Sequence, residues 1–523
     1  MRQRIQPEAD VENTGNNQIV SGVLILTISN LLVKVIGLLF KIPITNIIGD
    51  EGMGYFNAAY RIYTWFYMVS TAGLPVALSI MISSSRTKGN INEVKKIYRI
   101  TMILFVIIGV IGTAVMMVSS RFFAVLIGSE AIYMCIITIA PTLFFICISS
   151  AVRGFFQGYQ NMFPTAISQI FEAVGKLSLG IIFALYAINR GYDVPLVAAF
   201  AISGLTIGTA AGMLFLVIAK VMNRVDTIDS GQSARTNKAL ISTLIKLAIP
   251  ITVSASVMSL TDLIDVMIII RQLQNIGFSE ATAVALYGNY TSLAVPMFNL
   301  PPVLIYPISY SIIPMISSAV ASDNECKAVV IIKNALKLAV IISVPTSLGM
   351  SVFAKPILGI FYKSASVDMA APLLSILSMS VFFIGILAIT NAVLQAYGLE
   401  RKPIVSMIFG AAVKLISSTL LIGTPSVGIN GAPIGTFLCY LTITAINFYF
   451  INKYVKLDMN IFMKPITATV VCVAAAMLIY MVLKSVIFAI GIAGIVYVGV
   501  LFMINGITKE DIIMLRSVKK DER

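Results

Sequence analysis

The sequence predicts an all-α polytopic membrane protein with fourteen transmembrane helices, in two six-helix lobes followed by two C-terminal helices. Of the 523 residues, 58% are hydrophobic and 11% are charged, whereas about 25% of the residues in a typical soluble chain are charged. The mean hydropathy is +0.94. Apolar runs of about 20 residues, each long enough to cross the hydrocarbon core as a helix, recur from end to end.

Taken in order, these runs begin with a retained first helix, which is too long for a cleaved signal peptide. The longest polar connection predicts a linker between the two lobes. The predicted spans are 19–44, 54–84, 98–118, 131–152, 163–188, 194–219, 239–270, 283–318, 329–354, 369–396, 403–423, 428–451, 463–483 and 486–505. The predicted domains are an N-terminal tail 1–18, a first lobe 19–220, a linker 221–238, a second lobe 239–454, a two-helix segment 455–505 and a tail 506–523.

Lys and Arg residues alternate between the loops in the way that the positive-inside rule requires. With the N-terminus in the cytoplasm, the cytoplasmic segments hold roughly four times as many of them as the opposite loops. This bias predicts that both termini are cytoplasmic. Because the net charge of +14 is placed at helix ends, it does not indicate a nucleic-acid partner.

One segment in each lobe has the same pattern, which indicates an internal parallel repeat. The first is RGFFQGYQNMFPTAISQIFEAVGK, residues 153–176, and a weaker copy follows in the second lobe. The matching residues are Gln157, Pro164 and Lys176 in the first copy and Gln395, Pro403 and Lys414 in the second.

The predicted span 283–318 contains prolines that one straight helix cannot hold. Proline lacks the backbone N–H group and clashes with the preceding turn. We therefore expect this span to be bent or interrupted. The prolines are Pro296, Pro301, Pro302, Pro307 and Pro314.

The composition argues against an enzyme. The chain has no histidine, which excludes imidazole metal sites and histidine general bases. Its five cysteines are scattered without CxxC spacing and are expected to serve in packing. There is no Walker A motif, so the protein is not expected to hydrolyse nucleotides. We therefore expect a transporter with no cofactor, coupled to Na⁺ or H⁺, the membrane potential or the substrate gradient.

Ten charged residues fall inside predicted spans and are not counted with the loops. Each costs several kcal/mol near the bilayer centre, about 2.5 or more, unless it faces a cavity or a partner. The first lobe holds four of the cations against one acid, which predicts a positively charged cavity for a negatively charged substrate. The ten residues are Lys34, Lys41, Arg61, Lys176, Lys246, Lys337, Lys414, Glu172, Asp262 and Asp265.

Three cations near the start of the chain have two interpretations. Lys34 and Lys41 are seven residues apart and share one helix face. They either extend to the membrane interface or line an anion-binding cavity. Arg61 is either an interfacial anchor or a bidentate phosphate ligand.

Two further pairs also leave alternatives open. Glu172 and Lys176 are four residues apart and can pair. They either neutralise each other, or Lys176 contacts substrate while Glu172 sets its charge. Asp262 and Asp265 either make hydrogen bonds between helices or form a Na⁺ or H⁺ site.

The run RGFFQGYQNMFPTAISQIFE closely resembles the stage V sporulation protein B branch of the multidrug/oligosaccharidyl-lipid/polysaccharide (MOP) exporter superfamily. That branch is related to MurJ-type lipid II flippases. The run NLLVKVIGLLFKIPITNIIGDEGMGYFNAAYRIY also resembles the first two helices of the family. The resemblance implies the fourteen-helix fold, alternating access, and transfer of an undecaprenyl-diphosphate-linked cell-wall precursor from the inner to the outer leaflet.

The resemblance also implies site residues, because MurJ-type proteins use cations on helices 1, 2 and 8. Lys34 and Lys41 match those on helix 1, and Arg61 lies on helix 2. The stretch that matches helix 8, LYGNYTSLAVP, has no arginine. Lys176 or Arg153 is expected to substitute for it.

The family's Na⁺ site implies an Asp on helix 7, which is Asp262 or Asp265 here, and residues near helix 11, where Glu400 is the nearest acid. The favoured function is a lipid II flippase in a bacterial plasma membrane, acting in wall or spore-cortex synthesis, with wall-synthesis enzymes as possible partners. The alternatives are a flippase for another undecaprenyl-linked oligosaccharide, a cation-coupled drug exporter, a membrane enzyme and a non-transporting scaffold.

Overall fold

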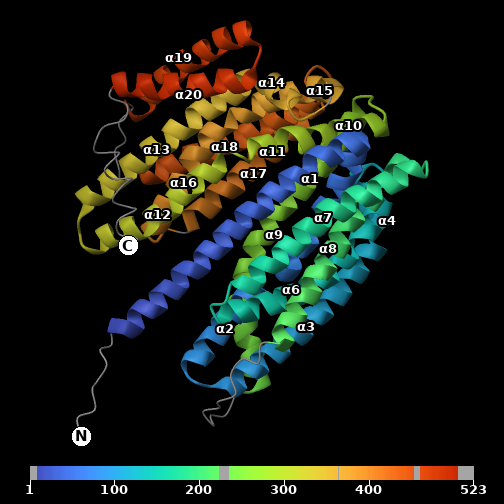
Figure 1. The fold of residues 1–523 in the computed structure, drawn as a ribbon, viewed down its shortest axis with the longest axis vertical. Coiled ribbons are helices and arrows are strands. Elements are labelled where there is room, and N and C mark those ends of the chain that lie inside the picture. The colour runs from blue at the N-terminus through green and yellow to red at the C-terminus, as the bar shows by residue number, and fades with distance from the viewer. Residues whose placement is uncertain (1–8, 223–234, 363, 400, 453–459, 505–523) are drawn as a thin grey trace. The chain divides into compact units, whose positions relative to one another are not determined.

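The structure is a computed structural model that describes residues 9–222, 235–362, 364–399, 401–452 and 460–504. These residues form helices joined by turns and contain no strand (Figure 1), so the predicted all-α fold class is confirmed. They divide into two compact units. The first unit holds the described residues up to Arg271 and also Glu280–Gly288. The second holds Gln272–Ser279 and the described residues from Asn289 onward.

The division into two six-helix lobes at residues 221–238 stays a prediction. Most of that linker, residues 223–234, lies outside the described residues. The compact units divide later in the chain, near the ends of α9 (Asn237–Asn275) and α10 (Glu280–Asn289).

The helices of the first unit precede this division. In addition to most of α9 and α10, they are α1 (Ala9–Thr71), α2 (Leu74–Thr87), α3 (Ile91–Val118), α4 (Ser120–Ile127), α5 (Ile132–Ile139), α6 (Pro141–Gly158), α7 (Phe163–Asn189) and α8 (Val194–Met222).

The long helix α1 is two helices that meet at a bend. Gly49 lies at the bend with φ 73° and ψ 179°, a backbone conformation that strains any residue with a Cβ atom. The bend falls between the predicted spans 19–44 and 54–84. The second of these spans is interrupted again, because α1 ends at Thr71 and α2 begins at Leu74.

Helices α7 and α8 touch backbone to backbone. A Cβ atom added at Gly175 would lie 2.4 Å from the Cα atom of Gly208, and one added at Gly208 would lie 2.9 Å from the carbonyl oxygen of Glu172. Both distances are shorter than a van der Waals contact. Small residues therefore let these two helices approach closely, as is common between membrane helices.

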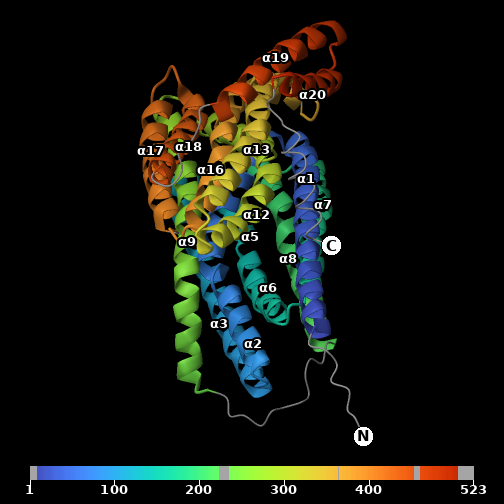
Figure 2. The same ribbon diagram turned by 90° about the vertical axis from the view of Figure 1, so that its left-hand side faces the viewer.

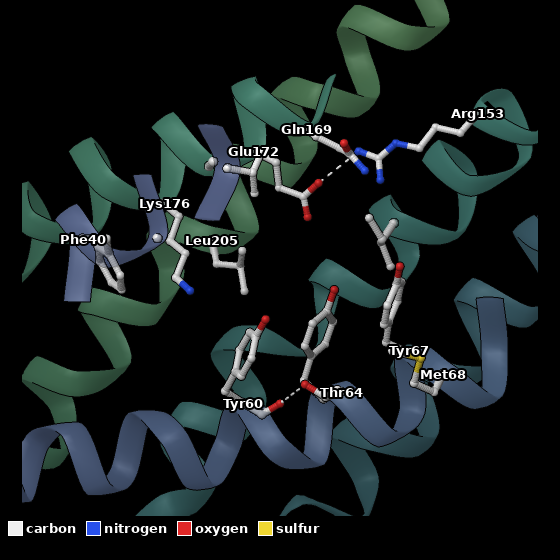
Figure 3. A pocket seen from close by; sticks show the side chains of 15 residues that line it. Phe40, Tyr60, Thr64, Tyr67, Met68, Arg153, Gln169, Glu172, Lys176 and Leu205 are labelled. Atoms are coloured by element: carbon white, nitrogen blue, oxygen red, sulfur yellow. Dashed lines mark hydrogen bonds and ion pairs between the residues drawn. The ribbon is translucent and has the colours of Figure 1, made fainter. Parts of the chain in front are cut away.

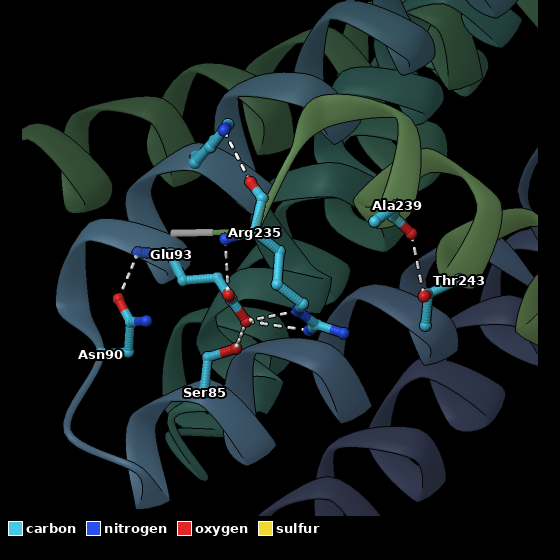
Figure 4. A network of polar contacts seen from close by, with 7 residues as sticks. Ser85, Asn90, Glu93, Arg235, Ala239 and Thr243 are labelled. Atoms are coloured by element: carbon cyan, nitrogen blue, oxygen red, sulfur yellow. Dashed lines mark hydrogen bonds and ion pairs between the residues drawn. The ribbon is translucent and has the colours of Figure 1, made fainter. Parts of the chain in front are cut away.

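A polar network joins the start of α9 to the hairpin of α2 and α3 (Figure 2; Figure 4). The buried carboxylate of Glu93 accepts hydrogen bonds from the backbone N–H and the guanidinium of Arg235, and its ion pair with Arg235 measures 2.8 Å. The Ser85 hydroxyl also donates to Glu93, at 2.8 Å. Asn90 caps α3 by accepting from the Glu93 N–H. The network therefore fixes where α9 begins.

The second unit begins with the interruption predicted for span 283–318, which is confirmed. After α10 the chain forms a π-helical turn, η1 (Tyr290–Ala294), then α11 (Val295–Phe298) and α12 (Pro302–Ala321). Pro302 opens α12, where its missing N–H costs nothing. Pro307 and Pro314 lie inside α12.

The remaining helices of the second unit follow α12. They are α13 (Glu325–Val352), α14 (Ala354–Gly359), α15 (Ser364–Ser378), α16 (Ser380–Ala396), α17 (Arg401–Ile422), η2 (Gly428–Asn430), α18 (Gly431–Ile451), α19 (Asn460–Leu483) and α20 (Val486–Met503). Helices α19 and α20 form a hairpin (Figure 1).

Twelve helices in the described part of the chain are long and apolar enough to cross a membrane. The number differs from the fourteen predicted spans for two reasons. The first two predicted spans form one helical stretch, Leu32–Thr87, and α9 is not among the twelve. The count of fourteen therefore stays a prediction.

We expect Glu93→Ala to lower the free energy of unfolding by about 1–2 kcal/mol, because the Arg235 N–H and the Ser85 hydroxyl lose their acceptor. The exposed half of the Arg235 side chain keeps the loss small. Thermal unfolding of the purified protein in detergent measures the effect as a lower Tm. Glu130→Ala is the matched control at an exposed carboxylate. Equal Tm shifts in both variants would contradict this role of the network.

We expect Gly208→Ala to force α7 and α8 apart and to cost about 1–3 kcal/mol, as overpacked positions do. The same Tm measurement applies. Gly349→Ala is the control, because a Cβ atom at Gly349 meets nothing within 4 Å. If Gly208→Ala is as stable as the control, the close contact between the helices is not needed.

Candidate functional site

A cavity of about 340 Å³ lies within the first unit, between α1, α6, α7 and α8. Figure 3 shows polar side chains converging on it from α7 and α6 on one side and from α1 on the other. Its polar lining includes Tyr60, Tyr67, Arg153, Gln169, Glu172 and Lys176.

Helical spacing explains why these side chains share the cavity. Gln169, Glu172 and Lys176 are three and four residues apart and occupy one face of α7. On α1, three tyrosines line the cavity at the same spacing. They are Tyr60, Tyr63 and Tyr67.

Arg153 and Glu172 form an ion pair at one end of the cavity. The Arg153 Nη2 atom lies 3.0 Å from Glu172 Oε2, and the two side chains are 11% and 21% exposed. Arg153 Nε also donates to the Ser168 hydroxyl at 3.0 Å. The Thr209 hydroxyl donates to Glu172 Oε1 at 3.3 Å. Both charges are therefore neutralised and held by hydrogen bonds from α6, α7 and α8.

Lys176 lies at the other end, among aromatic rings. Its ammonium is 4.9 Å from the centroid of the Phe40 ring, 5.0 Å from that of Tyr60 and 5.7 Å from that of Phe56. Within the described ranges no carboxylate pairs with it. Ring faces attract a cation but carry no net charge, so Lys176 has no direct ion-pair partner, and Glu172 attracts it only through space.

The predicted local pair of Glu172 and Lys176 is therefore not the pair that forms. Spacing of four residues permits the contact, but Glu172 pairs with Arg153, 19 positions earlier on α6. A guanidinium offers several donors in a fixed plane, which lets Arg153 donate to the Ser168 hydroxyl and to Glu172 at once. Glu172 and Lys176 form no direct ion pair among the described residues, and the role of Lys176 stays a prediction.

Three polar groups in the cavity have no partner in the part of the chain that the structure describes. The Gln169 Oε1 atom is buried without a hydrogen bond. The hydroxyl groups of Tyr60 and Tyr63, which also line the cavity, make no hydrogen bond with described residues. These groups are available to a bound molecule.

The other predicted cations of the first unit lie outside the cavity lining. Lys34 is exposed and Lys41 is half-buried. Arg61 forms an ion pair with Asp262 of α9, with Nη1 and Oδ2 2.7 Å apart. These side chains are 30% and 46% exposed. Arg61 is thus engaged by a carboxylate, whereas Lys176 is not.

The predicted ion-coupling site is not tested by this structure. Asp262 is paired with Arg61, Asp265 has other polar contacts, and Glu400 lies outside the described residues. Among described residues, no group of three or more Cys, Asp or Glu side chains is placed to hold a metal ion.

The remaining intramembrane cations lie away from the cavity. Lys246 on α9 is exposed, and Lys337 and Lys414 in the second unit are half-buried. Sequence reasoning missed the tyrosines and Gln169. The run YRIYTWFY, with aromatic residues every three or four positions, was the available signal for the tyrosines. Gln169 had no distinguishing signal.

Comparisons with known proteins agree with one another. The family described as polysaccharide biosynthesis protein matches residues 19–320, and MatE matches residues 250–420. Stage V sporulation protein B of Bacillus subtilis (strain 168) is 25% identical over 446 residues, which cover 84% of this chain and 85% of that protein. Lipid II flippase MurJ of the same organism is 24% identical over 468 residues, covering 86% and 85%.

A solved structure of lipid II flippase MurJ in an inward closed conformation has the same fold. Its TM-score is 0.69 at 14% sequence identity, and the match covers 92% of this chain and 98% of that one.

We expect Glu172→Met alone to cost about 3–5 kcal/mol, because it leaves the Arg153 guanidinium buried without a counterion. The double variant Arg153→Met/Glu172→Met removes both charges and should recover most of that loss. Chemical unfolding in detergent of the wild type, both single variants and the double variant measures the coupling. Additive losses would show that the pair is not coupled.

Proposed function

We propose, from the premise that this chain belongs to the polysaccharide biosynthesis protein family, that it is a flippase for lipid-linked glycans. Its relatives place it in the branch of the MOP superfamily that includes stage V sporulation protein B and MurJ, whose members are membrane transporters and not enzymes. The specific cargo that we propose is lipid II. It moves by alternating access from the inner to the outer leaflet of a bacterial plasma membrane.

The observation that carries this proposal is that Lys176 faces the cavity with no direct ion-pair partner among the described residues. Arg153 and Glu172 cancel each other, so these two and Lys176 together bring one net positive charge to the cavity lining. A charge in a membrane segment is costly unless it has a partner. An anionic group such as a diphosphate supplies that partner. A cationic drug would be repelled, which argues against the drug-exporter alternative.

The relatives support a lipid-linked cargo and leave a second candidate. One relative is named for lipid II, whereas the family description refers to polysaccharide biosynthesis. A flippase for another undecaprenyl-diphosphate-linked oligosaccharide is therefore the alternative. Both cargoes share the diphosphate that Lys176 would contact.

The energy source and orientation are further parts of the proposal. The bias of Lys and Arg between loops supports cytoplasmic N- and C-termini. The membrane potential supplies about 2.3 kcal/mol per net charge per 100 mV. Na⁺ or H⁺ coupling at Asp262, Asp265 and Glu400 is a second source, and a cation there would compete with Arg61 for Asp262. Contacts with wall-synthesis enzymes belong to the same proposal.

Proteoliposomes that contain the purified protein and labelled lipid II test the proposal. The rate at which label reaches the opposite leaflet is measured under a set membrane potential. We expect Lys176→Met to lower this rate about tenfold or more, because a charge-assisted contact contributes about 1.5–3 kcal/mol. Lys246→Met removes an exposed lysine of the same unit and should leave the rate unchanged.

Other outcomes of this assay would contradict the anion site, the cargo or the flippase function. An unchanged rate in Lys176→Met would show that the cavity is not the anion site. Transfer of another undecaprenyl-diphosphate glycan, but not lipid II, would favour the alternative cargo. If folded protein transfers none of these lipids, the flippase proposal fails and the scaffold interpretation leads.

A further inference from the structure

Cationic side chains gather at one end of the first unit. There the hairpin of α2 and α3 contacts the start of α9, because the Lys96 ammonium donates to the Arg235 carbonyl oxygen at 2.7 Å and Glu93 pairs with Arg235 (Figure 4). The end of α8 reaches the same place, where Lys220 lies over the ring of Tyr98 on α3. The eight cations that form this basic surface are Arg86, Lys88, Lys95, Lys96, Arg99, Lys220, Arg235 and Lys238.

Little negative charge compensates the basic surface. Glu93 is the one carboxylate among the described side chains there, and it is buried and already paired with Arg235. Six of the eight cations are exposed. Four of these make no ion pair or side-chain hydrogen bond with described residues, namely Lys88, Lys95, Arg99 and Lys238. Their charge therefore faces outward and is open to a partner.

The opposite end of the same unit has the reverse balance of charge. The Ser129 hydroxyl donates to Glu280 there. The described side chains at this end include five carboxylates and three guanidinium groups, those of Asp50, Glu51, Glu130, Asp193 and Glu280 and of Arg121, Arg190 and Arg271. The excess of cations is thus a property of one end and not of the unit as a whole.

A layer of aromatic rings lies under the basic surface. The ring centroid of Phe155 is 4.9 Å from that of Tyr98 and 4.7 Å from that of Tyr159. Lys220 lies 3.5 Å from the centroid of Phe155, and the Arg86 guanidinium lies 4.8 Å from that of Tyr159. Tyrosines beneath cations are typical of the depth at which lipid headgroups meet the hydrocarbon. We therefore place the basic surface at the level of the headgroups.

The number and spread of the cations favour one kind of partner. The exposed cations are distributed over α2, α3, α9 and the turns beside them, and a single diphosphate could contact only a few of them. A layer of anionic phospholipids brings one phosphate to each. Clusters of about four to eight Lys and Arg residues beside membrane helices are typical of binding to anionic lipids.

We propose that the basic surface binds the headgroups of several anionic phospholipids in the leaflet that it faces. The Glu93–Arg235 network holds the hairpin and the start of α9 together, so that their cations act as one surface. The positive-inside rule concerns how the chain is oriented on insertion, whereas this inference concerns lipids retained by the folded protein. It does not depend on which cargo the protein carries.

Lipid binding to the purified full-length protein tests the inference. The protein is delipidated in detergent and titrated with phosphatidylglycerol or with phosphatidylcholine of the same acyl chains, and native mass spectrometry counts the bound lipids. We expect phosphatidylglycerol to bind about fivefold more tightly or better, since each nearby cation favours an anionic lipid by about that factor. The preference should fall as the salt concentration rises.

A pair of double variants assigns the preference to the basic surface. Lys95 and Arg99 are exposed, share one face of α3 and lie outside the Glu93 network. We expect Lys95→Gln/Arg99→Gln to weaken phosphatidylglycerol binding about fivefold for each cation removed, with an unchanged Tm. Arg121→Gln/Arg190→Gln, which removes two exposed cations from the opposite end, should leave the binding unchanged.

Three outcomes would overturn the inference. The first is equal binding of the two phospholipids by the wild type. The second is a loss in Lys95→Gln/Arg99→Gln no larger than in the control. The third is a lack of phosphatidylglycerol binding together with binding of another anion that the same variant weakens. If that anion is undecaprenyl diphosphate, the surface is an entry site for cargo. If it is a polyglutamate peptide, the partner is an acidic protein segment.

Discussion

The ion pair of Arg153 and Glu172 decides where the first unit places its positive charge. The same three charged residues could pair in two ways, and both leave one net positive charge. If Glu172 paired with Lys176, the open charge would be Arg153, at the other end of the cavity. Because Arg153 takes the carboxylate, the open charge is the ammonium among the rings of Phe40, Phe56 and Tyr60. The position of the anion site therefore depends on a contact between two different helices.

Much of the fold could be predicted because helices in lipid must satisfy their own backbone groups. Apolar runs therefore mark helices, and the prolines of span 283–318 correctly indicated its interruption. The bend at Gly49 could not be predicted, because Gly37 and Gly52 lie in similar sequence and remain helical. Positive φ at one glycine is set by its tertiary surroundings and not by the glycine itself.

The charged members of the cavity were predictable and its neutral members were not. Arg153, Glu172 and Lys176 stand out because charge is rare inside apolar spans. Tyrosine and glutamine are less costly there, so their presence alone indicates little. The ion-pair partner of Glu172 also could not be predicted from the spacing of residues within one helix. Spacing on one helix identifies which residues can meet, but not which residue of a neighbouring helix comes closer.

The contact between Gly175 and Gly208 has a mechanical consequence. Two helices whose backbones touch cannot slide or tilt against each other without a clash. We therefore expect α7 and α8 to move together as one rigid unit. The spacing along α7 between Lys176, Glu172 and Gln169 then stays constant. Any change in the width of the cavity must then come from the tyrosine-bearing part of α1 or from α6. The cavity-lining side chains of α7 therefore keep fixed positions relative to one another, while the tyrosines of α1 move toward or away from them.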